Sequence, residues 1–367
     1  MASQAQHQSH DRDVCCAICA GPLRSIERWV DIGLLRQRNT MPFDNPQDRS
    51  QHKWKSAIEQ TCTIYDPSIV SESSAKWTSE LHVISIGLTI TEGYLSGTGF
   101  IKPNGNACFH RNLKDPPTAP MLEAPCYFDP RAIRNSLPVF PVHMCCLEIF
   151  MLVIDELAGL NSLNRLSLYG AMKHLVEPVE RVRLTINYGN PPPSNSNKWQ
   201  SKSGEEYFVA FPFSISPNKD LFCALLGPQF AFPAIPHDFR PHIRSDPFGT
   251  ISLELACKIG YYLPTKSIFN LLKASGAAHM LLSKDYVFWG NIIQREMPWF
   301  YELHGFIQEG LTKGRDVKGM LRWADRATTP KLGLEHWMLG LANRRRIWGA
   351  CEDLATHYIS RLPPSGV

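Results

Sequence analysis

The 367-residue sequence has no long apolar run, no strong charge imbalance and no apolar segment near its N-terminus. The longest apolar stretch, Cys145–Leu160, is interrupted by acidic residues and is too short to cross a bilayer, so no membrane partner is expected. The polar segment Met1–Asp13 lacks the hydrophobic region of a secretory signal, which predicts an intracellular protein of the cytoplasm, the nucleus or both. The net charge of +4, with one tight basic cluster at Arg344–Arg346, argues against nucleic acid as a partner. A solvated helix face or a helix C-terminus explains that triplet better than a targeting signal.

The sequence also lacks the motifs of common enzyme classes. It contains no Gly-x-Ser-x-Gly elbow, no Walker loop and no His-Glu-x-x-His zinc motif. Gly97-Thr98-Gly99 is not followed by the spacing that a dinucleotide site needs, and a turn between strands explains it better. We therefore expect no catalytic residues and no enzymatic activity.

What is present indicates an α+β chain of many short elements. The 28 prolines and 24 glycines predict frequent bends. Strands are expected at His82–Thr91, Glu92–Ile101 and Arg181–Tyr188, a strand-and-turn region at Glu206–Leu226, and a helix at Leu147–Leu160. The expected parts are a disordered N-terminus at 1–13, an α+β domain at 14–188, an exposed loop, strand pair and Pro-rich linker at 189–245, a helical segment at 246–300 and C-terminal helices at 301–367.

Three short amphipathic helices are predicted within residues 246–300. The first carries an apolar stripe at Ile251, Leu255, Ile259 and Tyr262. Thr265 can cap the second helix, and the third contains Tyr286–Ile293. Because no short helix buries its apolar face alone, the three should pack together. Further helices are expected at Val317–Trp323, Leu332–Trp348 and Cys351–Ile359.

The residue identities of this segment resemble a known motif. Asp246–Leu255 (DPFGTISLEL), then Leu271–Ser275 (LLKAS) and Phe288-Trp289, resembles the F-box, and more closely the F-box proteins abundant in filamentous fungi. Met297–Phe300 (MPWF), Leu341–Trp348 (LANRRRIW) and the Cys-x-x-Cys start of the chain also resemble that group. The resemblance therefore touches both ends of the chain, whereas its middle strands are generic.

The resemblance implies a non-catalytic substrate receptor. Such a protein links an unknown target protein to a cullin–RING ubiquitin ligase through the ligase's Skp-type adaptor. The residues implied to divide between the internal core and the adaptor's groove are Ile251, Leu253, Leu255, Ile259, Leu263, Leu271 and Leu272. The F-box usually opens Leu-Pro-x-Glu, whereas Ser252 takes the place of the proline here. This departure favours the alternative, a protein-interaction scaffold whose F-box-like fold does not bind the ligase.

Two separated pairs of residues could form a zinc site. Cys16–Cys19 has the spacing of a zinc knuckle, and His143 and Cys146 are three apart at the start of a predicted helix. At that spacing they share a helix face, while Cys145 points elsewhere. Together the pairs would give a closed Cys3His site for a structural zinc, with Cys15 as the fallback for Cys16. The alternatives are buried apolar thiols with a satisfied histidine, or redox-active cysteines.

Overall fold

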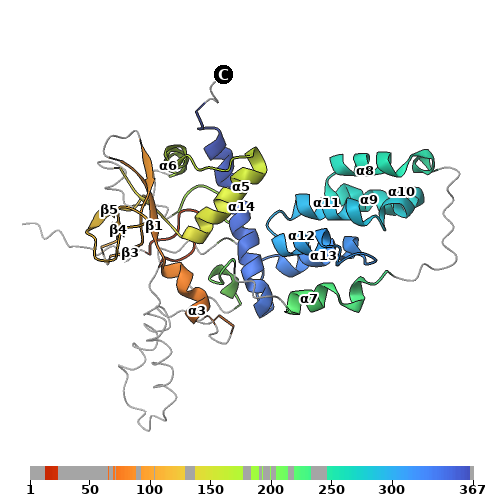
Figure 1. The fold of residues 1–367 in the computed structure, drawn as a ribbon, viewed down its shortest axis with the longest axis horizontal. Coiled ribbons are helices and arrows are strands. Elements are labelled where there is room, and N and C mark those ends of the chain that lie inside the picture. Colours follow the sequence, from red (N-terminus) through yellow and green to blue (C-terminus); the bar gives the residue numbers. More distant parts are fainter. Residues whose placement is uncertain are drawn as a thin grey trace, which may run out of the picture. The chain divides into compact units, whose positions relative to one another are not determined.

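The computed structural model describes two compact units. The described residues are 13–23, 65, 69–70, 72–87, 92–102, 104–128, 137–176, 183–189, 192, 199, 204–213, 219–232 and 246–363. Met1–Ser214 and Pro330–Val367 form the sheet unit, and Ile215–Thr329 forms the helical unit (Figure 1). Together they confirm the expected α+β class. Residues 1–12, most of the predicted 189–203 loop and residues 233–245 of the predicted Pro-rich linker lie outside the described residues.

Two three-stranded antiparallel sheets lie in the sheet unit. The first has the order β2-β1-β6, formed by Gly93–Leu95, His82–Ile86 and Phe140–Val142. The second has the order β3-β4-β5, formed by Gly99–Ile101, Asn106–His110 and Met121–Pro125. Ile84 of β1 pairs with Leu95 on one side and with Phe140 on the other, and all five β1 residues are buried. The strand β1 is therefore the core element of its sheet.

The predicted strand at 92–101 is wrong as a single element, because it divides into β2 and β3 of different sheets. The break lies at Gly97, whose N–H donates to the His110 carbonyl at 2.8 Å. A Cβ atom on Gly97 would lie 2.3 Å from the Asn112 carbonyl oxygen, so this close backbone passage requires glycine. The predicted strand at 82–91 is confirmed as far as Ile86, and its residues 88–91 lie outside the described part of the chain.

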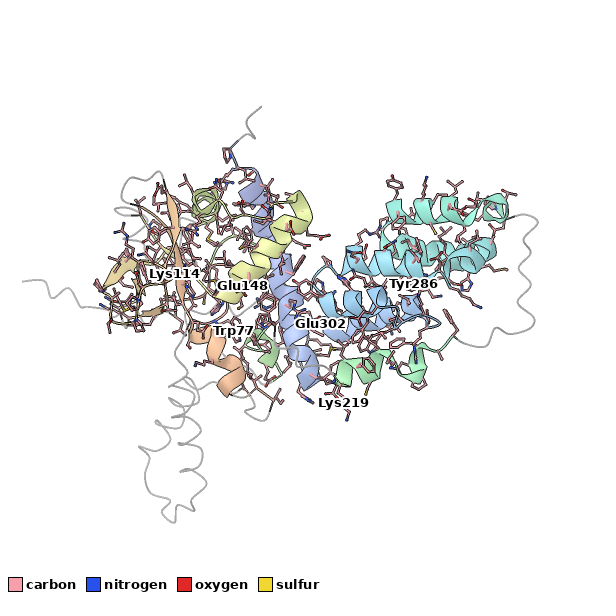
Figure 2. All side chains as sticks on the ribbon, viewed as in Figure 1. Trp77, Lys114, Glu148, Lys219, Tyr286 and Glu302 are labelled. Atoms are coloured by element: carbon pink, nitrogen blue, oxygen red, sulfur yellow. The ribbon has the colours of Figure 1, made fainter. Side chains whose placement is uncertain are left out.

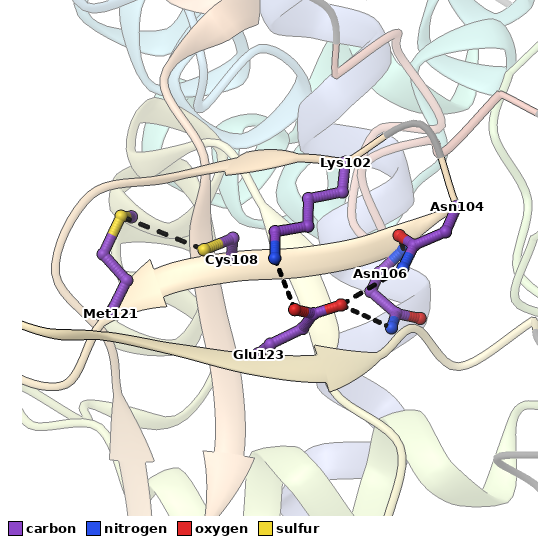
Figure 3. A network of polar contacts seen from close by, with 6 residues as sticks. All are labelled: Lys102, Asn104, Asn106, Cys108, Met121 and Glu123. Atoms are coloured by element: carbon purple, nitrogen blue, oxygen red, sulfur yellow. Dashed lines mark hydrogen bonds and ion pairs between the residues drawn. The ribbon is translucent and has the colours of Figure 1, made fainter.

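A polar network holds the hairpin between β3 and β4 onto β5. Glu123 on β5 accepts hydrogen bonds from Lys102, from Asn104 at 3.1 Å and from Asn106 at 2.9 Å (Figure 3). These donors, Lys102 first, lower the pKa of Glu123 to about 2. Gly105 in the turn has φ of 83°, a left-handed conformation that glycine adopts without strain.

Helices cover the sheets and close the sheet unit. The elements here are α3 Glu72–Ala75, η1 Lys76–Ser79, α5 Met144–Ala158, α6 Arg165–His174, η2 Glu206–Phe208, η6 His336–Met338 and α14 Leu339–Ile359. The long helix α14 packs against α5, α6 and η2, so α5 and α14 lie side by side in Figure 1. The two helices predicted across 332–359 are thus one helix. The expected tail at 301–367 is divided, since residues 330–367 belong to the sheet unit.

Two further strand predictions in this region are wrong. The described part of Arg181–Tyr188 forms only an isolated bridge between Leu184 and Val176. The predicted strand-and-turn region at 206–226 instead contains η2 and α7 Lys219–Leu225. Tyr207 and Phe208 of η2 are buried, and η2 packs against α14. These apolar residues therefore belong to a helical contact and not to a strand.

Residues 246–300 of the helical unit contain the three predicted helices and a fourth, α10. The elements of the unit are α7, η3 Pro228–Phe230, η5 Pro247–Thr250, α8 Leu253–Tyr262, α9 Thr265–Ala274, α10 Gly276–Leu282, α11 Tyr286–Glu296, α12 Tyr301–Gln308 and α13 Val317–Thr328. Helix α10 was missed, although Ser275 caps it by accepting a hydrogen bond from the Ala278 amide. Thr265 is the first residue of α9 rather than its cap, a position that Pro264 occupies. Among the described residues, no helix combines the length and apolar character that crossing a bilayer demands.

Helix α8 packs through small residues. Its buried members are Ala256 and Gly260, and α8 contacts α10. The Phe288 ring of α11 lies so close that a Cβ atom on Gly260 would be 2.6 Å from it. Glycine therefore sets the distance between α8 and α11.

We expect Gly260→Ala to destabilise the helical unit by about 1–3 kcal/mol, because the added methyl group would overlap the buried Phe288 ring and force α8 or that ring to shift. The matched control is Gly305→Ala on α12, where a Cβ atom meets nothing within 4 Å. Helix propensity predicts that this control stabilises by up to about 1 kcal/mol. Urea unfolding of both variants checks this, and equal midpoints for the two would contradict the close packing of α8.

Candidate functional site

The Cys16–Cys19 segment forms a tight turn. The Ala20 amide donates to the Cys16 carbonyl at 2.8 Å, and the Cys16 amide donates to the Gly21 carbonyl at 2.9 Å. Ala20 has φ of 54°, in the left-handed region that residues with a Cβ rarely occupy. The Gly21 amide donates to the Cys19 sulfur at 3.2 Å. The turn thus directs both thiols and one backbone N–H toward the same point.

The second pair lies where β6 runs into α5. His143 occupies the N-cap position of α5 with extended backbone, and Cys146 follows in the first turn. The backbone amide of His143 donates to the Cys16 sulfur at 3.5 Å. Thiolates at a helix N-terminus are stabilised by the helix dipole and its free N–H groups. Burial nevertheless outweighs this effect at Cys146 and raises its pKa well above the ordinary value, so the binding of a metal ion would have to displace the proton of this thiol.

The structure brings the two predicted pairs together. Cys16, Cys19, His143 and Cys146 are fully buried, and their four donor atoms lie within 4.8 Å of one another. The Nδ1 atom of His143 is 3.5 Å from the Cys19 sulfur and 3.7 Å from the Cys146 sulfur. Around a tetrahedral ion with zinc-like bond lengths, sulfur and nitrogen ligands lie about 3.6 Å apart. The cluster could therefore hold a metal ion with little rearrangement.

Backbone carbonyls fix the imidazole of His143. Its Nε2 atom lies 3.1 Å from the Pro22 oxygen and 3.2 Å from the Thr78 oxygen. Carbonyl oxygens only accept, so Nε2 carries a proton and Nδ1 faces the cysteines, where a bound metal ion would take the place of the Nδ1 proton. The Trp77 ring packs edge-on against the imidazole at 4.6 Å between centroids (Trp77 is labelled in Figure 2). Such outer contacts set the tautomer and orientation of metal-binding histidines.

The acid–base properties of the cluster also suit a metal. Burial alone would raise the pKa of Cys19, but hydrogen bonds from Cys146 and Cys16 and the positive charge of His143 lower it well below its ordinary value. Burial alone would lower the pKa of His143, but the negative charges of Cys16 and Cys19 raise it well above its ordinary value. The protein alone thus favours a thiolate–imidazolium pair, whose remaining protons a metal ion would displace.

The other cysteines near the cluster stay outside it. Cys15, the predicted fallback, is not among the clustered donors, and burial raises the pKa of its thiol. Cys145 is also outside, as its place on the helix predicted. Cys351 of α14 lies against the cluster from another side, with its sulfur 3.9 Å from the Cys146 carbonyl. Sequence reasoning missed this residue, because nothing in its spacing connects it with the pairs.

The most consequential missed residue is Arg346 of α14. The prediction of a solvated basic face is wrong, because Arg344 and Arg346 are only 1% and 3% exposed. The Arg346 guanidinium donates to the Cys19 carbonyl at 2.6 Å and to Asn343 at 2.9 and 3.2 Å, and lies 4.8 Å from the Phe208 ring centroid. A divalent ion bound by three thiolates and an imidazole leaves one net negative charge. With such an ion bound, the buried guanidinium of Arg346 would offset this charge.

The predicted adaptor-binding residues divide by exposure. Leu253 and Leu255 are exposed, at 37% and 48%, and Leu272 is buried. The half-buried members are Ile251, Ile259, Leu263 and Leu271. The predicted apolar stripe is thus not the packing face of α8, which turns Ala256 and Gly260 inward. We call Ile251, Leu255, Ile259 and Tyr262 the α8 stripe; its last member is 90% exposed.

The metal content of two variants, each with one of the neighbouring cysteines Cys145 and Cys146 replaced, tests whether the cluster binds an ion. We expect the purified protein to carry one metal ion per chain and Cys146→Ser to lose it, because a closed site needs four donors. Cys145→Ser, which changes an equally buried thiol outside the cluster, should keep the metal. Elemental analysis by plasma mass spectrometry reads both. A metal-free wild type purified without chelator would show that the cysteines are merely buried.

A second test concerns the buried charge. We expect Arg346→Met to weaken metal binding about 10–100-fold, because it removes both the countercharge and the hydrogen bond to Cys19. Arg344→Met is the control, since Arg344 is equally buried but donates to the Pro212 carbonyl instead. Competition with a chromophoric chelator measures the two affinities, and equal losses would refute a specific role for Arg346.

Comparison of the chain with protein-family models, with curated proteins and with solved structures found no match. What the protein does must therefore be inferred from the geometry of its two features, the closed Cys3His cluster and the α8 stripe.

Proposed function

We propose that this protein is a non-catalytic F-box-type adaptor, which links a target protein to a cullin–RING ubiquitin ligase through the ligase's Skp-type adaptor. The observation that carries the proposal is the α8 stripe, in a segment whose sequence resembles the F-box: Leu255 and Tyr262 are exposed, and Ile251 and Ile259 are half-buried. Leu255 and Tyr262 lie outside the buried side of α8, which is formed by Ala256 and Gly260, and both are exposed. Amphipathic helices that present such faces bind apolar grooves on partner proteins.

The packing of the helical unit explains how the stripe stays free. The unit's core forms around α11, where Phe288, Trp289 and Ile292 are buried. The Trp289 ring stacks on Phe269 of α9 and its indole N–H donates to the Leu282 carbonyl. Helix α8 adds little to this core beyond its small residues. Its larger apolar side chains therefore remain available to another protein.

The Asp-Pro-Phe lead of the motif is held in place by Asp246. Its carboxylate accepts hydrogen bonds from the Phe248 amide, from the Ser275 hydroxyl and from the Ala277 amide at the start of α10. These contacts, the Ala277 amide first, lower the pKa of Asp246. The lead and α10 are thereby fixed to each other, and the chain enters α8 from a defined direction.

Ser252 replaces the usual proline without loss of the helix start. Its hydroxyl accepts a hydrogen bond from the Leu255 amide at 3.4 Å and caps α8. Glu254 in the first turn adds a favourable charge near the helix N-terminus. The proline's own contact with the adaptor would be absent. The remaining stripe would have to provide the binding energy.

We further propose that the metal of the Cys3His cluster is zinc in a structural role. Three thiolates and one imidazole are the donor set that zinc prefers, and four protein donors leave no position for water or substrate. A bound ion would hold the Cys16–Cys19 turn on the start of α5. It would thereby stabilise the sheet unit, which we propose recognises the target protein.

Co-purification with a Skp-type adaptor tests the ligase role. We expect the wild type to retain the adaptor and Leu255→Asp to lose at least about 90% of it, because a buried unpaired carboxylate is strongly unfavourable. The matched control is Leu157→Asp, the same change at a leucine of α5 that is 52% exposed. It should bind like the wild type.

A folded wild type that fails to retain the adaptor would remove the ligase role. The alternative, a scaffold with an F-box-like fold, would then be the better proposal, favoured by Ser252 at the proline position. Adaptor binding that survives Leu255→Asp would instead place the contact elsewhere on the helical unit.

A further inference from the structure

The sheet unit contains a cavity that neither the metal cluster nor the α8 stripe uses. Its volume is about 560 Å3, and it is lined by residues of β1, β2, β5, α6 and the segment after β4. Ile86 and Leu95 form a buried apolar part, while Leu113 and Leu122 are more than 40% exposed at its edge. This size suits a few side chains of a ligand rather than a single ion.

Two arginines from distant parts of the chain line this cavity. Arg111 follows β4 and Arg165 begins α6, and both are exposed. The hydrogen bonds and ion pairs of the described residues include neither guanidinium, whereas Arg295 and Arg315 have partners. Glu92 is the one acidic lining residue, so the lining carries a net positive charge. The charge of Arg111 also acts on Asp115, which is not a lining residue, and helps lower the pKa of that carboxyl. Two guanidiniums beside apolar side chains favour an anionic group joined to an apolar one.

The backbone positions of both arginines are fixed. Asn112, next to Arg111, donates to the Asp115 carboxylate from its amide at 2.8 Å and from its side chain at 3.1 Å. Asp115 is thereby engaged, and these Asn112 hydrogen bonds lower its pKa. Beside Arg165, the backbone of Gly93 approaches α6 so closely that a Cβ atom would lie 2.3 Å from the Leu166 nitrogen. The backbone that carries the two arginines is therefore positioned without a ligand, which limits the backbone entropy lost on binding.

We propose that this cavity binds a peptide segment in which an anionic side chain, phosphorylated or carboxylate, lies next to an apolar one. If the protein is a substrate receptor, as proposed above, this segment belongs to its target. The arginines would pair with the anion through their planar N–H groups, and the apolar neighbour would lie on Ile86 and Leu95.

The test uses three degenerate peptide libraries that share a fixed leucine and differ only in the preceding residue, which is phosphoserine, glutamate or serine. Each is passed over the immobilised full chain, and mass spectrometry measures the retained fraction. We expect at least one anionic library to be retained about tenfold more than the serine library. Arg111→Gln combined with Arg165→Gln should lower that retention to the serine level.

The matched control combines Lys114→Gln with Lys173→Gln, which removes the same charge from the same two regions outside the cavity (Lys114 is labelled in Figure 2). It should bind within about twofold of the wild type, and a greater loss would reveal a nonspecific charge effect. Equal retention of all three libraries, or unchanged retention by the double arginine variant, would overturn the proposal. The ratio between the phosphoserine and glutamate libraries identifies which anion is preferred.

Adaptor binding is measured on the same variants to separate this inference from the ligase role. The double arginine variant should retain the Skp-type adaptor like the wild type, because the cavity lies in the sheet unit. Peptide binding without adaptor binding would leave the cavity's role standing and remove the ligase role. Adaptor binding without selective peptide binding would support the ligase role and overturn the peptide-binding role of the cavity.

Discussion

The Cys16–Cys19 turn meets the first turn of α5 across 124 residues of sequence, and the sheet unit is organised around this contact. The four buried donors contact one another and nearby backbone N–H groups, because unpaired polar groups and charges are unfavourable away from water. A metal ion bound there would be coordinated by all four donors at once and would close a long loop of the chain, which would restrict the unfolded state. The Pro22 and Thr78 carbonyls that hold the His143 imidazole add η1 as a third segment. One small cluster thus ties together three parts of the fold.

The helix α14 in the C-terminal part of the chain also reaches this cluster. Helix α14 reaches the turn through Arg346, and its Cys351 lies against the carbonyl of Cys146. A guanidinium that is 3% exposed needs acceptors and a countercharge, and this site offers both once three thiolates are ionised. The helix therefore supplies more than apolar surface to α5. It completes the electrostatic surroundings of the cluster from the opposite end of the sequence.

Local patterns predicted a good part of this structure. The period of three and four placed α5, α8, α9, α11 and α13 within a few residues, and the spacing of two residue pairs identified all four clustered donors. What failed required knowledge of distant neighbours. The basic triplet at 344–346 looked solvated because burial of an arginine depends on partners elsewhere in the chain. The strand at 92–101 looked continuous because only the approach of Asn112 to Gly97 reveals the break. The sequence does not predict that Arg111 and Arg165 line one cavity, because these residues are far apart along the chain and only the fold places both at the cavity.

Helix α8 shows how the same pattern can carry an opposite meaning. An apolar stripe at helical spacing usually marks the buried face, yet here Ala256 and Gly260 are inside and Tyr262 is outside. Gly260 makes this inversion feasible, because it lets α8 approach the Phe288 ring without help from larger side chains. A helix so held contributes little apolar burial to its own unit. The exposed part of its stripe is left uncovered within the helical unit, and a partner of either proposed kind, for an F-box adaptor or for a scaffold, would cover it. What separates them is whether the stripe alone, without the proline that Ser252 replaces, fits the groove of the ligase's adaptor.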